Sequence, residues 1–321
     1  MRRQAAKARS IRAVAGGPAS PLAALVGTLV YLALPAKRAS MQDNLEVILG
    51  RYAPAGRPLP EHRRRAAARR LARRQMVAYV QTLIDFFRLP TMLPQIYRDT
   101  AATPGWEHVD AALASGRGAV FATIHFGHWD LAGAAVANHC PPGSVYAVAE
   151  PFENPRLDRL VTARRNAYGI RPVPMDNVRQ MVRVLREGKL LGLLVDRPVE
   201  GGDGVPVRFF GRETQVPAGA ATLALLAKAP LLPGYVRQRR DGSFEGEILP
   251  PIEPVRTGDR EADVRATMQL VMDALESVIR RSPHQWYMFR PMWPASARPE
   301  AVPSGIRATL RAALPGSRKA R

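Results

Sequence analysis

AVFATIHFGHWDL, residues 119–131, is the stretch from which the fold can be worked out. Its first six residues are an apolar run, which is typical of a buried strand, and the run ends at His125. Gly127 allows a turn, and Asp130 stands at the expected start of a helix that continues to about Asn138. The stretch therefore predicts a strand, a turn and a helix, with a histidine at the carboxyl end of the strand.

The spacing of His125 and Asp130 makes these two residues the first candidates for catalysis. In open α/β sheets, ligands bind at the carboxyl ends of the strands. A neutral imidazole can take a proton from a hydroxyl near pH 7, and a carboxylate can orient the ring and stabilise the imidazolium. The spacing alone also fits a structural interpretation, in which Asp130 only caps the helix. His128 lies nearby, but Gly133 is the fifth residue after it, so we interpret His128 as a neighbour of the base.

Strand-like and helical segments alternate along the rest of the chain. Further strands are expected at residues 145–149, 170–173, 190–195, 205–210, 230–237 and 243–249, and helices at 41–50, 61–88, 154–168, 177–187, 217–228 and 260–281. This alternation predicts an α/β fold with a mostly parallel central sheet that is covered by helices on both faces.

Length, composition and charge limit the class of protein. The 321 residues suffice for one large α/β domain, and a hydrophobic content of 46% is typical of a globular protein. The net charge of +20 favours anionic partners, although a codon usage rich in Ala, Arg and Pro would also raise the arginine content. Cys140 is the one cysteine, which excludes an internal disulfide and fits a reducing compartment. A nucleophilic Cys140 beside His125 is the less favoured alternative.

The first 40 residues differ from the rest of the chain. Residues 1–19 are basic, and 21–34 form an apolar run that is too short for a confident membrane span. We expect a helix embedded in the cytoplasmic face of a membrane, with a signal-peptide core and an ordinary buried helix as alternatives. The chain is thus divided into a basic tail with a membrane-associating helix at 1–40, a catalytic domain at 41–295 and a flexible basic tail at 296–321.

Seven arginines between residues 63 and 74 form the densest basic run. No helix-turn-helix, zinc-finger or aromatic RNA-binding motif accompanies it, so no nucleic-acid partner is expected. Membrane contact or a solvated helix face is the favoured interpretation of the run.

Charged residues stand where several predicted strands end. Glu150 follows the strand at 145–149, and Asp196 and Arg197 follow the strand at 190–195. Because the carboxyl ends of parallel strands share one edge of the sheet, we expect these side chains to gather near His125.

Motifs in the order and spacing of a known family run from about residue 40 to 294. They are Asn44-Leu45, residues 124–133 (IHFGHWDLAG), Glu150-Pro151, Arg164-Arg165-Asn166, Asp196-Arg197, Gly204-Val205, Phe209-Phe210-Gly211 and residues 283–293 (PHQWYMFRPMW). In these residues the chain resembles the bacterial lipid A biosynthesis acyltransferases, and within them the actinobacterial phosphatidylinositol mannoside acyltransferases.

The resemblance implies a membrane-associated enzyme with a glycerolipid acyltransferase-like fold. Such an enzyme moves a long acyl chain from a thioester donor, acyl-CoA or acyl carrier protein, to a sugar hydroxyl of a glycolipid at the cytoplasmic face of the plasma membrane. It implies no metal and no cofactor besides the acyl donor, and a monomer is expected. His125 would be the general base and Asp130 its partner. The resemblance assigns substrate contacts to Glu150, Arg164, Arg165, Asp196, Arg197, Phe210 and Gly211.

One departure from the family pattern concerns the strand after the Gly-rich turn. Family members often carry acidic residues there, where this chain has Pro206 and Arg208. Glu200 lies nearby, but nothing in the sequence makes it their replacement. The departure leaves open the acceptor contacts and any second carboxylate on His125.

Three other functions remain as alternatives. A lipid A-type or other glycolipid acyltransferase would use the same chemistry on another acceptor. A hydrolase would need its own nucleophile, and the chain has no Gly-x-Ser-x-Gly motif. A non-enzymatic basic protein that binds membrane or nucleic acid would need the arginines at 63–74 and not His125.

Overall fold

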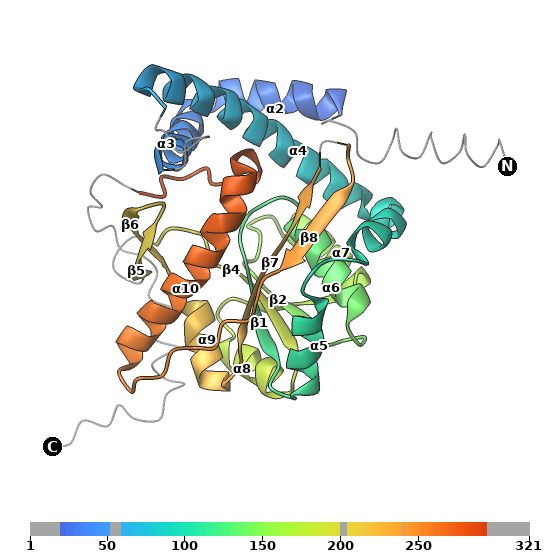
Figure 1. The fold of residues 1–321 in the computed structure, drawn as a ribbon. Helices are drawn as coiled ribbons and strands as arrows, with labels where there is room; N and C mark the ends of the chain where they lie inside the picture. The colour runs from blue at the N-terminus through green and yellow to red at the C-terminus, as the bar shows by residue number, and fades with distance from the viewer. Residues whose placement is uncertain (1–19, 52–58, 200–203, 240, 294–321) are drawn as a thin grey trace.

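The structure is a computed structural model that describes residues 20–51, 59–199, 204–239 and 241–293 (Figure 1). The two predicted tails therefore lie largely outside the described residues, as does Glu200.

A sheet of six strands forms the centre of the molecule, in the order β3-β2-β4-β1-β7-β8. The strands are β1 (Ala119–Thr123), β2 (Val145–Ala149), β3 (Ile170–Pro174), β4 (Leu190–Leu194), β7 (Leu231–Gln238) and β8 (Phe244–Ile248). The first five in this order are parallel, and β8 pairs antiparallel with β7. The predicted mostly parallel sheet is confirmed.

Helices cover both faces of the sheet (Figure 1). Val120 and Ala122 of β1 share a core with α8 (Val178–Arg186), α9 (Gly219–Ala227) and α10 (Arg260–Arg281). Ala119 and Phe121 belong to another core with α5 (Trp106–Ala114) and α6 (Trp129–His139). Because successive strand residues point to opposite faces, this division places a helical layer on each side. The helix α7 (Pro155–Ala167) lies beside α6.

Three N-terminal helices pack on the top of the molecule in Figure 1: α2 (Pro21–Ala33), α3 (Pro35–Arg51) and α4 (Glu61–Thr100). Gly27 lets α2 approach α4 closely, since a Cβ there would lie 2.6 Å from the Val77 Cα. In the described part of the chain, no single helix has the length and apolar character to cross a membrane. The helices α2 and α3, bent by 100° at their junction, pass that test only as a pair.

Three elements differ from the predictions. The helix α4 does not end at Arg88 but continues through Pro90 and Pro94. Residues 212–217 form the strand β6 (Arg212–Pro217), which pairs with β5 (Gly204–Phe209) in a hairpin outside the central sheet. In addition, α3 begins at Pro35 rather than at Met41. The other predicted elements differ from the observed ones by only one or two residues at their ends.

Candidate active site

His125 and Asp196 meet because β1 and β4 are parallel neighbours. Thr123 is opposite Leu194 in the register of the two strands. The Val195 amide then donates to the Thr123 carbonyl over 2.9 Å. His125 and Asp196 follow at the same level of the two strands, and the His125 Nδ1 lies 2.7 Å from the Asp196 Oδ1. The pair therefore stands at the carboxyl edge of the sheet, where α/β folds bind ligands.

Asp196 is fully buried and serves as an acceptor for several donors. Its Oδ2 accepts from the His125 amide over 3.0 Å and from the Trp286 Nε1 over 2.8 Å. Burial by itself would raise the pKa of this carboxyl, but His125 and these hydrogen bonds outweigh burial and hold the pKa below its ordinary value. Asp196 is thus a carboxylate at neutral pH, fixed against the imidazole.

The expected pairing of His125 with Asp130 is not the pairing in the structure. Asp130 forms an ion pair with Arg165, with 2.8 Å between its Oδ1 and the arginine Nε, and this pair joins α6 to α7. The physical reason is that His125 and Asp130 belong to different elements across a turn, whereas His125 and Asp196 leave adjacent strands side by side. The carboxylate on His125 is therefore Asp196.

The His125 side chain is 16% exposed and lies next to an aromatic pair. The imidazole meets Trp129 at a centroid distance of 5.5 Å, and Trp129 meets Tyr287 at 5.9 Å. With Nδ1 bonded to Asp196, Nε2 is the ring nitrogen that can accept a proton from a substrate.

The C-terminal segment 283–293 holds the His125 loop in place. The Tyr287 amide donates to the His125 carbonyl over 2.7 Å, and the Gly127 amide donates to the Gln285 carbonyl over 2.8 Å. Gly127 has a φ of +55°, and a Cβ there would lie 2.2 Å from the Val236 carbonyl oxygen. A glycine is needed at this turn because both the backbone conformation and the contact exclude a side chain.

His128 lies in the interior, beside the candidate base. Its ring is buried against Phe244, and its Nε2 is 3.9 Å from the Asp85 Oδ2. Burial lowers the pKa of His128 to about 3 and raises the pKa of Asp85 to about 6. His128 is therefore a neutral side chain of the core at physiological pH.

A second charged pair lies on the same edge of the sheet. Glu150 follows β2, Arg197 follows Asp196, and the two side chains form a salt bridge that is about half exposed. The expected gathering of charged side chains at the strand ends is confirmed by this pair and by His125 with Asp196. Because the salt bridge is open to water, its groups are available to a polar ligand.

The remaining expected site residues lie in different surroundings. Arg164 is on the last turn of α7, next to Arg165. Phe210 and Gly211 form the two-residue turn of the β5–β6 hairpin, both with positive φ. Phe210 is buried and contacts the Trp293 ring at 6.1 Å. Its side chain therefore belongs to the aromatic core rather than to the open edge of the sheet.

An apolar cavity of about 80 Å³ lies between α6 and the sheet. Trp129, Asp130 and Arg165 stand at one end of it, and Val145 and Leu190 stand at the other. Gly133 on α6 and Gly192 on β4 are among its lining residues. The cavity runs from beside the His125–Asp196 pair toward the opposite edge of the sheet.

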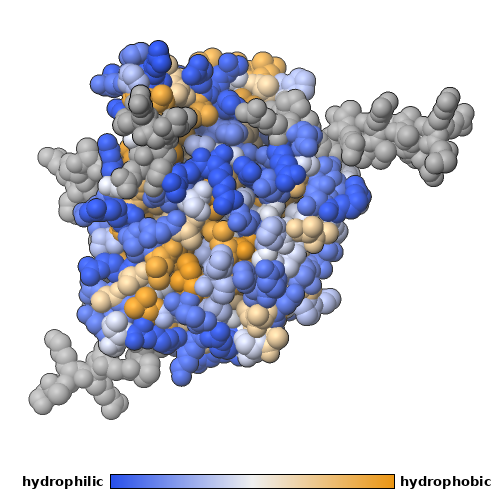
Figure 2. Space-filling view, viewed as in Figure 1, coloured by the Kyte–Doolittle hydropathy of each residue, from blue (hydrophilic) through white to orange (hydrophobic). Residues whose placement is uncertain are grey.

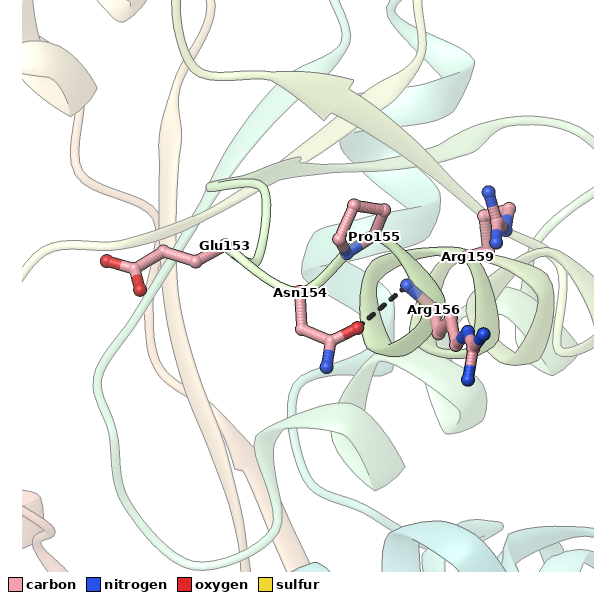
Figure 3. A pocket seen from close by; sticks show the side chains of 5 residues that line it. All are labelled: Glu153, Asn154, Pro155, Arg156 and Arg159. Atoms are coloured by element: carbon pink, nitrogen blue, oxygen red, sulfur yellow. Dashed lines mark hydrogen bonds between the residues drawn. The ribbon is translucent and has the colours of Figure 1, made fainter.

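A shallow hollow at the start of α7 is open to water (Figure 3). It is lined by Glu153, Asn154, Pro155, Arg156 and Arg159, all of them exposed. The Asn154 Oδ1 accepts from the Arg156 amide over 2.9 Å, as an N-cap does, and Glu153 points away from the two arginines. The hollow is explained by the capped helix, and we assign it no ligand.

Cys140 is buried, and burial raises the pKa of its thiol to about 12. It is therefore protonated near neutral pH and unsuited to act as a nucleophile. In the ranges that the structure describes, no three His, Cys, Asp or Glu side chains are placed to hold a metal ion.

Sequence reasoning missed Trp286 and Tyr287 as parts of the site. It noticed their segment only through the resemblance, because a residue that donates to a buried carboxylate has no signature of its own. For Asp196 the sequence shows that an aspartate follows an apolar strand, and the structure adds that this strand lies beside the His125 strand.

Comparison with known proteins agrees with the resemblance. Residues 6–294 match the model of a family described as bacterial lipid A biosynthesis acyltransferase. A phosphatidylinositol mannoside acyltransferase of Mycobacterium tuberculosis (strain CDC 1551 / Oshkosh) is 32% identical over 225 residues, which are 65% of this chain and 66% of the relative. The protein of the same name from Mycolicibacterium smegmatis is 28% identical over 72% of this chain and 74% of the relative. A lipid A biosynthesis acyltransferase of Haemophilus influenzae is 26% identical over 57% and 55% of the two chains.

Proposed function

The chain belongs to the bacterial lipid A biosynthesis acyltransferase family, and from that membership we propose that it transfers a long acyl chain from a thioester to a sugar hydroxyl of a glycolipid. The observation that carries the proposal is the His125–Asp196 pair, which stands at the carboxyl edge of the sheet beside an apolar cavity. The proposed acceptor is a phosphatidylinositol mannoside, because the two mycobacterial relatives carry that name and match more of this chain than the Haemophilus relative does.

In the proposed reaction, His125 is the catalytic residue. Its Nε2 takes the proton of the sugar hydroxyl while the hydroxyl oxygen attacks the thioester carbonyl carbon. The tetrahedral intermediate then collapses, the carbon–sulfur bond breaks, and the imidazolium returns the proton to the leaving thiolate. Asp196 is a positioning residue, since it holds Nδ1 and stabilises the imidazolium. A thiolate leaves readily, so the reaction needs no strong acid at the leaving group.

The acyl chain of the donor would enter the cavity between α6 and the sheet. The cavity is apolar for most of its length, and its one polar end carries the Asp130–Arg165 pair beside the catalytic edge. At about 80 Å³ it is too small for a long chain, so we expect α6 to move outward from the sheet when the donor binds. The thioester would then lie near His125, at the entrance of the cavity.

The polar parts of the substrates would contact the exposed edge of the sheet. Glu150 and Arg197 offer a carboxylate for sugar hydroxyls and a guanidinium for anionic groups, and Arg164 lies on the nearby α7. The donor is acyl-CoA or an acyl carrier protein, either of which carries negative charge that suits a strongly basic chain.

The proposed place of action is the cytoplasmic face of the plasma membrane. The face of α2 turned away from α4 exposes Leu22, Leu25, Leu29 and Leu32 to about 60%. Figure 2 shows apolar side chains at the top of the molecule, where α2 lies in Figure 1. A helix with one apolar face lies in the membrane interface and would bring the site to an acceptor that stays in the lipid.

A lipid A-type acceptor is the second candidate, and it is favoured by the match to the Haemophilus relative.

Purified protein should be incubated with radiolabelled palmitoyl-CoA and one of two acceptors, either a phosphatidylinositol mannoside or a lipid A precursor. We expect labelled mannoside, and a loss of at least about 10²-fold in the rate for His125→Ala, which is the usual contribution of a general base. Label in the lipid A precursor alone would favour the second candidate. Full activity of a folded His125→Ala variant would contradict the mechanism.

A further inference from the structure

A cavity of about 1020 Å³ lies where α2, α4, the end of β7 and the end of α10 meet. Neither His125 nor Asp196 lines it. Tyr287 and His128 form part of its wall, and the Tyr287 amide also donates to the His125 carbonyl. The cavity is thus next to the candidate active site and separate from it, with the size of a small-molecule site.

Six arginines line this space, which we call the arginine cavity: Arg70, Arg73, Arg74, Arg237, Arg239 and Arg281. The first three come from α4, and the other three come from β7, the residue after it and α10. Glu245 is the one acidic residue among the described residues of the lining. Two groups of positive charge therefore face one space from different elements.

The positive charge of the cavity is only partly balanced inside the protein. Arg237 and Arg239 share the single carboxylate of Glu245. Arg281 pairs with Glu247 of β8. In the described ranges, Arg70, Arg73 and Arg74 form no salt bridge, although the Arg73 Nε donates to the Thr28 hydroxyl over 3.2 Å. Several like charges held together in this way favour a polyanion.

Buried polar atoms on the wall of the cavity also lack partners. Among the described residues, the Arg237 Nε, the Gln238 Nε2 and the His128 Nδ1 are buried without a hydrogen bond. All three residues line the cavity. The Arg237 and Gln238 atoms are donors, and buried donors without a partner are unfavourable, so such atoms are expected where an anionic ligand accepts their hydrogen bonds.

We propose that the arginine cavity binds a ligand that carries at least two phosphate groups. The α4 arginines hold one phosphate, and Arg237 with Arg239 holds the other, since guanidinium groups match phosphate oxygens in pairs. The cavity opens beside α2, so the phosphates can belong to a soluble molecule or to the headgroup of a lipid. The inference does not depend on the proposed acyl transfer.

The test uses two probes and three variants of the full chain. Inorganic pyrophosphate is titrated by calorimetry as the soluble probe, and vesicles of phosphatidylcholine with and without cardiolipin present the lipid bisphosphate. The cavity variant is Arg70→Gln/Arg73→Gln/Arg74→Gln. The matched control is Arg63→Gln/Arg65→Gln/Arg69→Gln, which removes the same charge from the same helix outside the lining. Ala24→Trp fills the cavity from α2 without any change of charge.

We expect the cavity variant to weaken the binding of one probe at least ~10-fold, the control less than ~3-fold, and Ala24→Trp at least ~5-fold. The effect on pyrophosphate identifies a soluble ligand, and an effect confined to cardiolipin vesicles identifies a lipid headgroup. Equal losses in the two arginine variants, an unchanged affinity in Ala24→Trp, or no binding of either probe by the wild type would overturn the inference. His125→Ala should bind the probe as the wild type does, so a failure of the acyl transfer proposal leaves this result intact.

Discussion

A fully buried carboxylate stays ionised only if donors surround it, and Asp196 receives hydrogen bonds from the His125 ring, the His125 amide and Trp286. The same three contacts fix the imidazole in one orientation. Asp130 forms its ion pair with Arg165 and serves to join two helices. At the residue scale, the two aspartates therefore have different tasks, and mutation can tell them apart.

Asp196→Asn should lower kcat at least ~10²-fold with little change in KM, because the amide keeps the shape of the carboxylate but cannot stabilise the imidazolium. Asp130→Asn should lower kcat only about tenfold, because losing the ion pair with Arg165 loosens the packing of α6 on α7 and shifts the nearby site slightly. Steady-state kinetics of both variants, with melting curves to establish folding, make the comparison. A larger loss in Asp130→Asn than in Asp196→Asn would mean that the spacing in the sequence identified the partner correctly.

Burial raises the pKa of Asp85 to about 6. The folded protein keeps this proton to a higher pH than the unfolded chain, so ionisation of Asp85 lowers stability as the pH rises from about 4 to 6. Asp85→Asn removes that loss and should stabilise the protein by about 2–3 kcal/mol at pH 8. The advantage should shrink toward pH 4. Chemical denaturation at pH 8 and at pH 4 measures the free energy of unfolding of both proteins. An equal gain in stability at the two pH values would contradict the prediction.

Two glycines, Gly133 of α6 and Gly192 of β4, line the apolar cavity between this helix and the sheet. Gly192 is half-buried on β4, and a Cβ there would meet its nearest neighbour, the Tyr146 carbonyl oxygen, at an ordinary 3.5 Å. A larger side chain at this position can therefore be accommodated by the backbone, and it would occupy the cavity that we assign to the acyl chain.

Gly192→Leu should change the choice of donor rather than abolish activity. We expect the rate with a 16-carbon donor to fall about tenfold or more relative to an 8-carbon donor, because the new side chain fills the inner part of the cavity. Competition between the two donors measures the ratio directly. Leu270→Ala, on the exposed face of α10, is the control and should leave the ratio unchanged. An unchanged ratio in Gly192→Leu would place the acyl chain elsewhere.

Most of the helices and strands could be predicted from the sequence, but the order of the strands in the sheet could not. Apolar runs and helical periodicity are sufficient to predict the central sheet. Charged residues at the strand ends are sufficient to predict which edge of the sheet carries the candidate site. The pairing inside that edge depends on strand order, and β4 lies beside β1 although the two are about 70 residues apart in the chain. Chain spacing carries no information on strand order, so it favours Asp130, although Asp196 is the carboxylate that contacts His125 in the structure.

The errors in element boundaries have local physical causes. Proline normally ends a helix, but α4 continues past Pro90 because Leu89, Met92 and Ile96 are buried against Leu131 of α6. The strand β6 buries only Thr214 and Val216 deeply, a pattern too short and polar to recognise in the sequence. Tertiary packing decided the structure in both cases.

At the scale of the whole molecule, the apolar and basic surfaces lie next to each other. The leucines of α2 point away from the body, and the arginine-rich first half of α4 lies directly against α2. This arrangement would let apolar side chains enter a membrane while arginines contact anionic headgroups. It would also orient the molecule, with the side that carries α2 and the first half of α4 toward the membrane.

The membrane orientation can be tested with two exposed leucines. Leu25 and Leu29 of α2 are 61% and 57% exposed, so Leu25→Ser/Leu29→Ser should not disturb the fold. Full insertion of one leucine contributes about 1.5–3 kcal/mol, and the double variant should therefore bind vesicles at least ~10²-fold more weakly. Flotation with phosphatidylglycerol vesicles measures the binding, and the wild type should remain bound at high salt because the contact is largely apolar. The control is Leu270→Ser, which replaces an exposed leucine on α10, away from α2. This variant should bind vesicles as the wild type does. If both variants lost binding equally, or if salt alone released the wild type, the attachment would be electrostatic and α2 would not be the membrane-facing element.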